Sequence, residues 1–333
     1  MSAAALSTAG LQPAKRRIRS PWAGFILRRL VSFFVSLWFI LTLVFFLVRA
    51  IGGDSIRAAA GIMATPEYIA AKREQFGLDD PILVQYGDFF QRIIHLDFGN
   101  SLSTGQPVIS EIAVRFPYTA QLGGYSFLLA ILLSVPLGMA MAVRTQDGRG
   151  SRGEAVFNAV TGFFAAVPDF LIAIGLILVF AVGLHLVPAA GGSGPVAFIL
   201  PVITVSTGLV AVLSRLVKSE TARVLKEEYV RTARANQLSP TVVLGRHVLP
   251  NVLTATLTFT GMVLASLLGG AIITETVFAW PGIGNLLVKA IQLYDFTLLE
   301  GLVVVISGFS LIILLLVDVL LVIVDPKSLM LRS

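Results

Sequence analysis

The sequence predicts an all-α membrane protein with six transmembrane helices, and two observations carry this prediction. Of its 333 residues, 56% are hydrophobic and only 13% are charged, which leaves too little charge to cover a soluble globule of this size. Six apolar runs are also long enough to cross about 30 Å of hydrocarbon at about 1.5 Å per helical residue. We therefore expect a multi-pass protein surrounded for most of its length by the lipid bilayer.

The N-terminal part predicts a tail followed by one anchor helix. Residues 1–28 carry a basic cluster and form a predicted cytoplasmic tail, and residues 29–50 form the first transmembrane helix. A cleaved signal peptide would have a shorter apolar core and a small-residue cleavage site directly after it, and this run has neither. We expect the anchor to stay uncleaved.

Residues 51–116 are polar and predict a small extracytoplasmic domain. Between positions 51 and 117 there are eight acidic and five basic residues. One helix is expected to follow Thr65 and to end at Gly77, and a second is expected from Pro81 to about Ile94. Two short helices and a loop thus follow the first span.

Residues 117–323 predict a core with five further spans. These spans are expected at about 118–143, 155–182, 196–213, 252–273 and 298–324. Gly123-Gly124 and Gly138 in the first of them suit close helix packing. An amphipathic outer segment at 274–297 separates the last two spans, and a short cytoplasmic tail at 324–333 closes the chain.

Lys and Arg are distributed unequally between the two sides of the predicted membrane. The two tails, the loop between the second and third spans and the charged stretch before the fifth span hold eighteen of them, whereas the three opposite segments hold six. Short cytoplasmic loops collect Lys and Arg. Both termini and the charged stretch are therefore expected in the cytoplasm.

The charged stretch covers residues 219–250, and we expect a helix, a corner and a second helix within it. The first helix is favoured at 227–236, which contains neither Gly nor Pro. Ser239 can cap a second helix whose first residue is Pro240. That helix is expected to end before Pro250, because the residue that precedes a proline is disfavoured in the α region.

Three stretches resemble one protein family. The charged stretch reads YVRTARANQL and later Leu249-Pro250, and it resembles the cytoplasmic EAA loop of the permease subunits of dipeptide- and oligopeptide-type ABC importers. Residues 64–108 resemble that family's segment after its first span, and residues 275–296 resemble its ETVFAWPG stretch. The ATPase-coupling residues implied by the resemblance are Tyr229, Val230, Arg231, Thr232, Ala233, Arg234, Ala235, Gln237, Leu249 and Pro250.

The resemblance also implies how this loop acts and shows one departure. Tyr229 and Val230 would give apolar contacts to an ATPase, while Arg231 and Arg234 would give charge-assisted bonds. Gln237 stands at the corner where the family usually has Gly. A side chain with a Cβ costs about 1 kcal/mol or more at positive φ, so the geometry of the corner is an open question.

A type I ABC importer permease core, in the bacterial cytoplasmic (inner) membrane, is what the resemblance implies for the whole chain. Such a subunit is not catalytic and forms half of the translocation pathway for di- or oligopeptides. Its implied partners are a second homologous permease subunit, two cytoplasmic ATPase subunits and an extracytoplasmic substrate-binding protein. ATP and Mg would bind to the ATPases and no cofactor to this chain, which contains no GxxxxGK[ST] loop.

Asp169 is the candidate pathway residue. It is the one acidic residue near the middle of a predicted span, and a carboxylate there costs about 2.5–3.5 kcal/mol when it faces lipid. Two interpretations stay open: the carboxylate contacts a positive group of the substrate, or it hydrogen-bonds to backbone freed by Pro168 or to a neighbouring helix. Asp318, near the end of the last span, is expected to reach the interface or to pair with an Arg.

Four residues are candidates for the outer mouth of the pathway: Phe278, Trp280, Pro281 and Gly282. The two aromatic rings favour the membrane interface, and Pro281-Gly282 favours a turn ahead of a short helix. A docking or gating surface is one interpretation. An interfacial helix without a partner is the other.

Several other functions are excluded or less favoured. The absence of Cys and the scatter of three His exclude thiolate or zinc-type metal sites, and the net charge of +6 fits cytoplasmic loops better than nucleic-acid binding. Nickel chelates, glutathione and oligosaccharides remain alternative substrates for the same importer type. An ion-coupled secondary transporter is the alternative class, although it would be expected to have several intramembrane acids or histidines.

Overall fold

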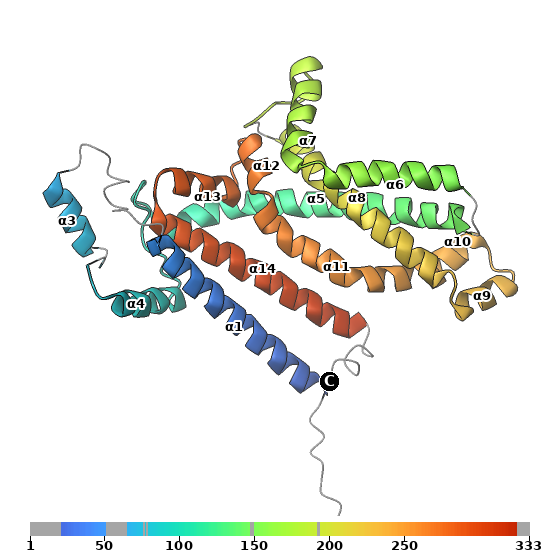
Figure 1. The fold of residues 1–333 in the computed structure, drawn as a ribbon, viewed down its shortest axis with the longest axis horizontal. Helices are drawn as coiled ribbons and strands as arrows, with labels where there is room; N and C mark the ends of the chain where they lie inside the picture. Colours follow the sequence, from blue (N-terminus) through green and yellow to red (C-terminus); the bar gives the residue numbers. More distant parts are fainter. Residues whose placement is uncertain are drawn as a thin grey trace, which may run out of the picture.

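Figure 1 shows the computed structural model of the chain, which describes residues 21–50, 65–75, 77, 79–146, 150–191 and 194–324. These residues are helical, and an isolated bridge between Asn100 and Pro107 is the one strand-like pairing among them. Most of the expected N-terminal tail, the stretch 51–64 of the polar domain and the C-terminal residues 325–333 lie outside the described residues.

The helices follow one another in an order close to the expected one. The α-helices are α1 (Pro21–Ala50), α3 (Pro66–Gln75), α4 (Ile82–Ile94), α5 (Val108–Arg144), α6 (Ser151–Ala166), α7 (Asp169–Leu176), α8 (Ile199–Val224), α9 (Glu228–Ala235), α10 (Pro240–Val242), α11 (Leu249–Gly270), α12 (Ile272–Val277), α13 (Ile283–Gln292) and α14 (Phe296–Val324). Two π-helical stretches, η2 (Ile177–Gly183) and η4 (Val243–Val248), and one 3-10 turn, η3 (Pro195–Phe198), complete the described elements. Helices α3 and α4 are the two expected for the polar domain.

Four described helices are long and apolar enough to cross a membrane, and a bent pair would make a fifth. The four are α1, α5, η3 with α8, and α14, and the bent pair is α6 with α7 and η2. The all-α membrane architecture is therefore confirmed, with four to five candidate spans where the sequence predicts six. Helix α11 occupies the place of the expected span at 252–273.

The expected third span at 155–182 is not one continuous helix but a bent pair that passes the test for a span only when its two parts are taken together. Its two parts are bent by 97° relative to each other, and Figure 1 shows α7 turning away from the direction of α6. Val167 is extended, with φ −72° and ψ 124°, because the ring of Pro168 disfavours the α conformation in the residue before it. Asp169 is therefore the first residue of a new helix after the bend.

Helices α5 and α8 pack closely because Gly138 has no side chain. A Cβ at this position would lie 2.6 Å from the carbonyl oxygen of Ser214 and 2.7 Å from Cβ of Val217. A Cβ at Gly124 of the same helix would meet nothing within 4 Å. The expected role in close packing thus holds for Gly138 and does not hold for Gly124.

Two ion pairs fix α1 against α14. Nη2 of Arg29 lies 2.6 Å from Oδ1 of Asp318, and Nη1 of Arg49 lies 2.9 Å from Oε1 of Glu300. Asp318 thus pairs with an Arg as expected, whereas the pairing of Glu300 was not predicted. Because the early residue of α1 pairs with the late residue of α14, the two helices run antiparallel, and the start of α1 lies beside the end of α14 (Figure 1).

Candidate coupling loop and pathway residues

Helix α9 is held to the rest of the chain by an apolar face. It runs from Glu228 to Ala235, within one residue of the expected bounds at each end. Val230 and Ala233 are three positions apart, so they share one face of the helix. Both are buried in a cluster that includes Val217 and Val224 of α8 and Val248 of η4. The loop is therefore a structured unit resting on α8 and η4.

The burial of Val230 corrects one expectation. Its side chain is 0% exposed, so in this structure it contacts its own chain and does not offer an apolar surface to a partner. Tyr229, its neighbour on the other side of the helix, is 43% exposed. The aromatic ring is thus the apolar group of this pair that a partner can reach.

The outward face of α9 is basic. The side chain of Arg231 is 65% exposed and pairs with Glu228 of the same helix at 3.0 Å. Arg234 donates through Nη2 to Oε1 of Gln146 at 3.2 Å, which ties α9 to the segment after α5. Thr232 donates to the carbonyl of Glu228 at 3.0 Å. The two guanidinium groups therefore stand at the surface with only light attachment to their own chain.

The corner after α9 has the conformation that a glycine adopts easily. Gln237 has φ +58°, in the left-handed region, although its Cβ is unfavourable there. Gln237 in place of the usual glycine therefore adds strain at the corner, and the backbone still adopts the left-handed conformation. Ser239 is the N-cap of α10 and Pro240 its first residue, as expected, but the Ser239 hydroxyl lies 3.2 Å from that of Thr241 and makes no capping bond.

The second helix does not stop before Pro250, contrary to prediction. Leu249 keeps helical angles, φ −54° and ψ −47°, and its N–H donates to the carbonyl of Leu244, five residues earlier. The π-helical η4 ends at Val248, and Pro250 is the second residue of α11. A proline in a helix interior has no N–H to donate and clashes with the carbonyl four residues earlier, and the wider π turn changes that spacing. The corner therefore leads into α11 through continuous helix.

Asp169 is the first residue of α7, directly after the bend. It lies beside Gly208 of α8, where a Cβ would be 3.5 Å from Oδ1 of Asp169. Within the described part of the chain, no group donates a hydrogen bond to this carboxylate. A negative charge in the first turn of a helix is favourable, so the position is stabilised without any clamp on freed backbone.

The outer-mouth candidates differ from their expected exposure. Phe278 is 2% and Trp280 is 4% exposed, and the indole Nε1 donates to the carbonyl of Tyr118 at 3.2 Å. The ring of Trp280 meets that of Phe198 edge-on, with centroids 4.5 Å apart. Both rings are thus covered by their own chain, Phe278 by residues of α7 and α8 and Trp280 by residues of α5 and η3, whereas Pro281 beside them is exposed.

Glu275 is a buried carboxylate that the sequence analysis missed. It accepts hydrogen bonds from Thr119 Oγ1 at 2.5 Å and from the backbone N–H of Asn285 at 3.0 Å, and the N–H of Ile283 donates to the same Thr119 hydroxyl. Burial raises the pKa of Glu275, and these hydrogen bonds oppose that rise. A Cβ at Gly282 would lie 2.3 Å from the carboxylate, so this glycine is required for the contact between α12 and α13.

A second missed carboxylate, Asp295, holds the loop before α5. Its Oδ2 accepts hydrogen bonds from the Ser101 hydroxyl at 2.5 Å and from the backbone N–H of Ser103 at 2.9 Å. Its Oδ1 accepts from the N–H of Leu298 at 3.1 Å. Burial alone would raise the pKa of Asp295, but these hydrogen bonds outweigh it and lower the pKa. The only local signal in the sequence is an acid directly before a long apolar run.

Comparison with known proteins decides the family. Residues 134–329 match the family described as binding-protein-dependent transport system inner membrane component, and residues 23–123 match the N-terminal region of the same type of protein. The chain belongs to this family. It is therefore the non-catalytic permease component of an ABC transporter, and a multi-pass inner-membrane protein.

Individual relatives match this permease over almost their whole length. It is 35% identical over 302 residues to the glutathione transport system permease protein GsiC of Salmonella typhimurium, covering 91% of this chain and 97% of the relative. It is 35% identical over 311 residues to the probable peptide ABC transporter permease protein y4tP of Sinorhizobium fredii, covering 91% and 98%. It is 34% identical over 312 residues to the probable D,D-dipeptide transport system permease protein DdpB of Escherichia coli K12, covering 85% and 91%.

A solved structure shares the fold of this permease. The inward-facing MetNI methionine ABC transporter superimposes with a TM-score of 0.56 at 16% identity, covering 65% of this chain and 96% of that chain. At this identity the likeness concerns the fold alone.

The corner at Gln237 allows a direct test of whether a Cβ is unfavourable in the left-handed conformation. We expect Gln237→Gly to raise the free energy of unfolding by about 0.5–1 kcal/mol, because it removes the Cβ that is unfavourable at positive φ. This corresponds to a rise of about 2 °C in the melting temperature of the detergent-purified chain. Gln237→Ala is the control, since it removes the amide and keeps the Cβ, and it should not stabilise. Equal melting temperatures for the Gly and Ala variants would contradict the assignment of strain to the Cβ.

Proposed function

We propose that this permease forms half of the translocation pathway for di- or oligopeptides that a substrate-binding protein delivers, with ATP hydrolysis on partner subunits as the driving force. Membership in a binding-protein-dependent family supports both the ATPase and the binding-protein partners. The peptide substrate is supported by relatives named for peptide and D,D-dipeptide transport. A second, homologous permease would supply the other half of the pathway, and ATP and Mg would bind to two ATPase subunits.

Glutathione is the competing substrate, because GsiC is named for its transport. The peptide and glutathione hypotheses assume the same pathway and differ in which binding protein delivers the substrate. Nickel chelates and oligosaccharides have no counterpart among these three relatives. Family membership also favours ATP hydrolysis over an ion gradient as the energy source.

The observation that carries this proposal is the two-sided structure of α9. Its inner face, Val230 and Ala233, is buried with residues of α8 and η4, while Tyr229, Arg231 and Arg234 face outward. Because η4 continues into α11 without a break, a force on the outer face acts on α8 and α11 together. A helix held this way is suited to pass the motion of an ATPase into the membrane helices.

Reversing the charge of the outer face tests the coupling role. We expect Arg231→Glu with Arg234→Glu to leave the protein in the membrane but to abolish stimulation of ATPase activity by the binding protein, since the charge-assisted bonds to the partner become repulsive. Stimulated ATPase activity and uptake are measured in membrane vesicles. Lys289→Glu, a single charge reversal at an exposed position of α13, is the control. Normal uptake by the double variant would remove the coupling assignment.

Six spans with both termini in the cytoplasm are the proposed topology. The unequal distribution of Lys and Arg supports it. The antiparallel pairing of α1 with α14 also supports it, because it places the start of α1 and the end of α14 on the same side of the membrane. Helix α9 would face the cytoplasm and α3 and α4 the opposite side.

Single cysteines test this topology, because the natural chain has none. A cysteine at Asp79 should react with a membrane-impermeant thiol reagent in intact spheroplasts, and one at Ser239 should react only after the membrane is permeabilised. Both positions are exposed, so accessibility depends on the side of the membrane. The reverse pattern would invert the topology.

Asp169 is proposed to meet a positive group of the substrate in transit. Its half-exposed carboxylate, with no hydrogen-bond donor among the described residues, supports a contact outside this chain. We expect Asp169→Asn to slow uptake about tenfold or more while assembly and basal ATPase activity persist, because a charge-assisted hydrogen bond contributes about 1.5–3 kcal/mol. Asp88→Asn on exposed α4 is the control.

The structural alternative makes a different prediction for Asp169. A residue that only stabilises the bend would tolerate Asn and would not tolerate Leu. Unchanged uptake with Asn, together with loss of folded protein with Leu, would remove Asp169 from the pathway.

A further inference from the structure

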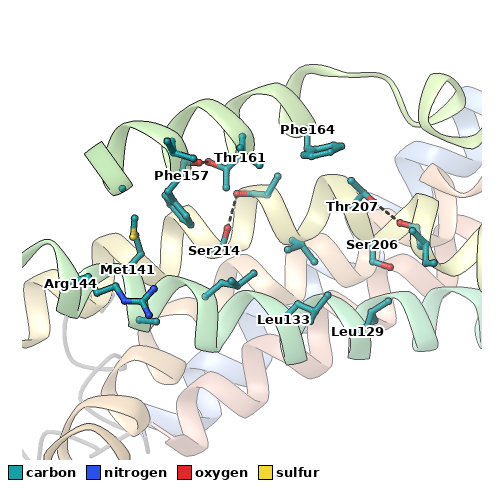
Figure 2. A pocket seen from close by; sticks show the side chains of 18 of the residues that line it. Leu129, Leu133, Met141, Arg144, Phe157, Thr161, Phe164, Ser206, Thr207 and Ser214 are labelled. Atoms are coloured by element: carbon teal, nitrogen blue, oxygen red, sulfur yellow. Dashed lines mark hydrogen bonds between the residues drawn. The ribbon is translucent and has the colours of Figure 1, made fainter. Parts of the chain in front are cut away.

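An apolar groove runs between α5, α6 and α8, on the side of the permease that faces away from α11 (Figure 2). Its volume is about 810 Å³. Leu129, Leu133 and Leu137 of α5 form one wall, and Val156, Val160 and Phe164 of α6 form the other. From Leu129 to Arg144 the groove follows α5 for roughly 22 Å, at about 1.5 Å per residue. This shape fits a long, thin, apolar ligand.

The hydroxyl groups along the groove are not available as hydrogen-bond donors to a ligand. Thr161 donates to the carbonyl of Phe157 at 2.7 Å and Thr207 to that of Ile203 at 2.7 Å. Ser214 donates to the carbonyl of Ala211 at 3.2 Å, as the dashed line in Figure 2 marks. Because each hydroxyl proton is used by its own helix, the groove provides an apolar lining along most of its length.

Positive charge is concentrated at one end of the groove. Arg144 is the last residue of α5 and Arg152 lies in the first turn of α6, so the two guanidinium groups come from opposite walls. Figure 2 shows Arg144 at the end away from Leu129 and Phe164. No carboxylate lines the groove, and within the described residues neither Arg makes an ion pair. The end of the groove is thus suited to an anion.

We propose that this groove is a binding site for an anionic phospholipid of the leaflet on the α9 side, with an acyl chain between α5, α6 and α8 and the phosphate group between Arg144 and Arg152. A phospholipid supplies both features that the groove requires, a long apolar chain and a negative group at one end. Basic pockets between membrane helices bind acidic headgroups for this reason. A helix of another subunit in the same place would need its own carboxylates at the level of both Arg residues.

Lipid retention tests the headgroup contact. The full-length chain is extracted into mild detergent with equal amounts of phosphatidylglycerol and phosphatidylcholine, and bound lipid is counted by native mass spectrometry. We expect a preference for phosphatidylglycerol that falls by about thirtyfold in Arg144→Gln with Arg152→Gln, equivalent to about 2 kcal/mol, since each cation at a membrane surface contributes to anionic-lipid binding. An unchanged preference in the double variant would overturn the proposal.

Arg215→Gln is the matched control for this experiment. Arg215 follows Ser214 on α8 but lines a different pocket, so its replacement removes one positive charge near the groove, as each of the two test substitutions does, without altering the groove. The phosphatidylglycerol preference should persist in this variant. An equal loss in Arg215→Gln would indicate general surface attraction and would overturn the specific site.

Cross-linking in native membranes identifies the occupant. A photoreactive benzoylphenylalanine at Val160, which is 49% exposed in the groove, should give an adduct with the mass of a phospholipid. An adduct with another protein subunit would assign the groove to a subunit interface and would overturn the lipid site.

Discussion

The close approach of α5 and α8 is the contact on which the rest of the permease depends. Gly138 leaves room for the backbone at Ser214 and for Val217, and Val217 belongs to the same buried cluster as Val230 of α9. A short chain of contacts therefore leads from the C-terminal part of α5 to α9. The same pairing forms the floor of the apolar groove beneath α6. Separating the two helices by one methyl group would disturb both surfaces at once.

Two buried carboxylates have the complementary role at the opposite end of the molecule. Glu275 holds the first turn of α13 to Thr119 of α5, and Asp295 holds the loop at Ser101 and Ser103 to the start of α14. Each accepts several hydrogen bonds, which offsets the cost of burying its charge. These segments are thus fixed by directional bonds, whereas the α9 end is fixed mainly by apolar contacts.

The features predicted correctly from sequence are local ones. The bounds of α9, the N-cap position of Ser239 and the place of Pro240 depend on residues within one or two turns, so propensities and caps are enough to find them. Glu275 and Asp295 could not be assigned in this way, because their partners are 156 and 192 to 194 positions away. The burial of Phe278 and Trp280 has the same cause, since α7 and α8 cover the first ring and α5 and η3 the second only after the helices assemble.

The prolines show why a local rule succeeds in one place and fails in another. Pro168 ends its helix, because Val167 takes up an extended conformation and the chain turns by 97°. Pro250 does not, because the π register of η4 carries the helix across it, and Pro117 and Pro136 lie inside α5. In the proposed coupling role this difference is functional: a break before Pro250 would absorb the motion of α9, whereas continuous helix passes it to α11.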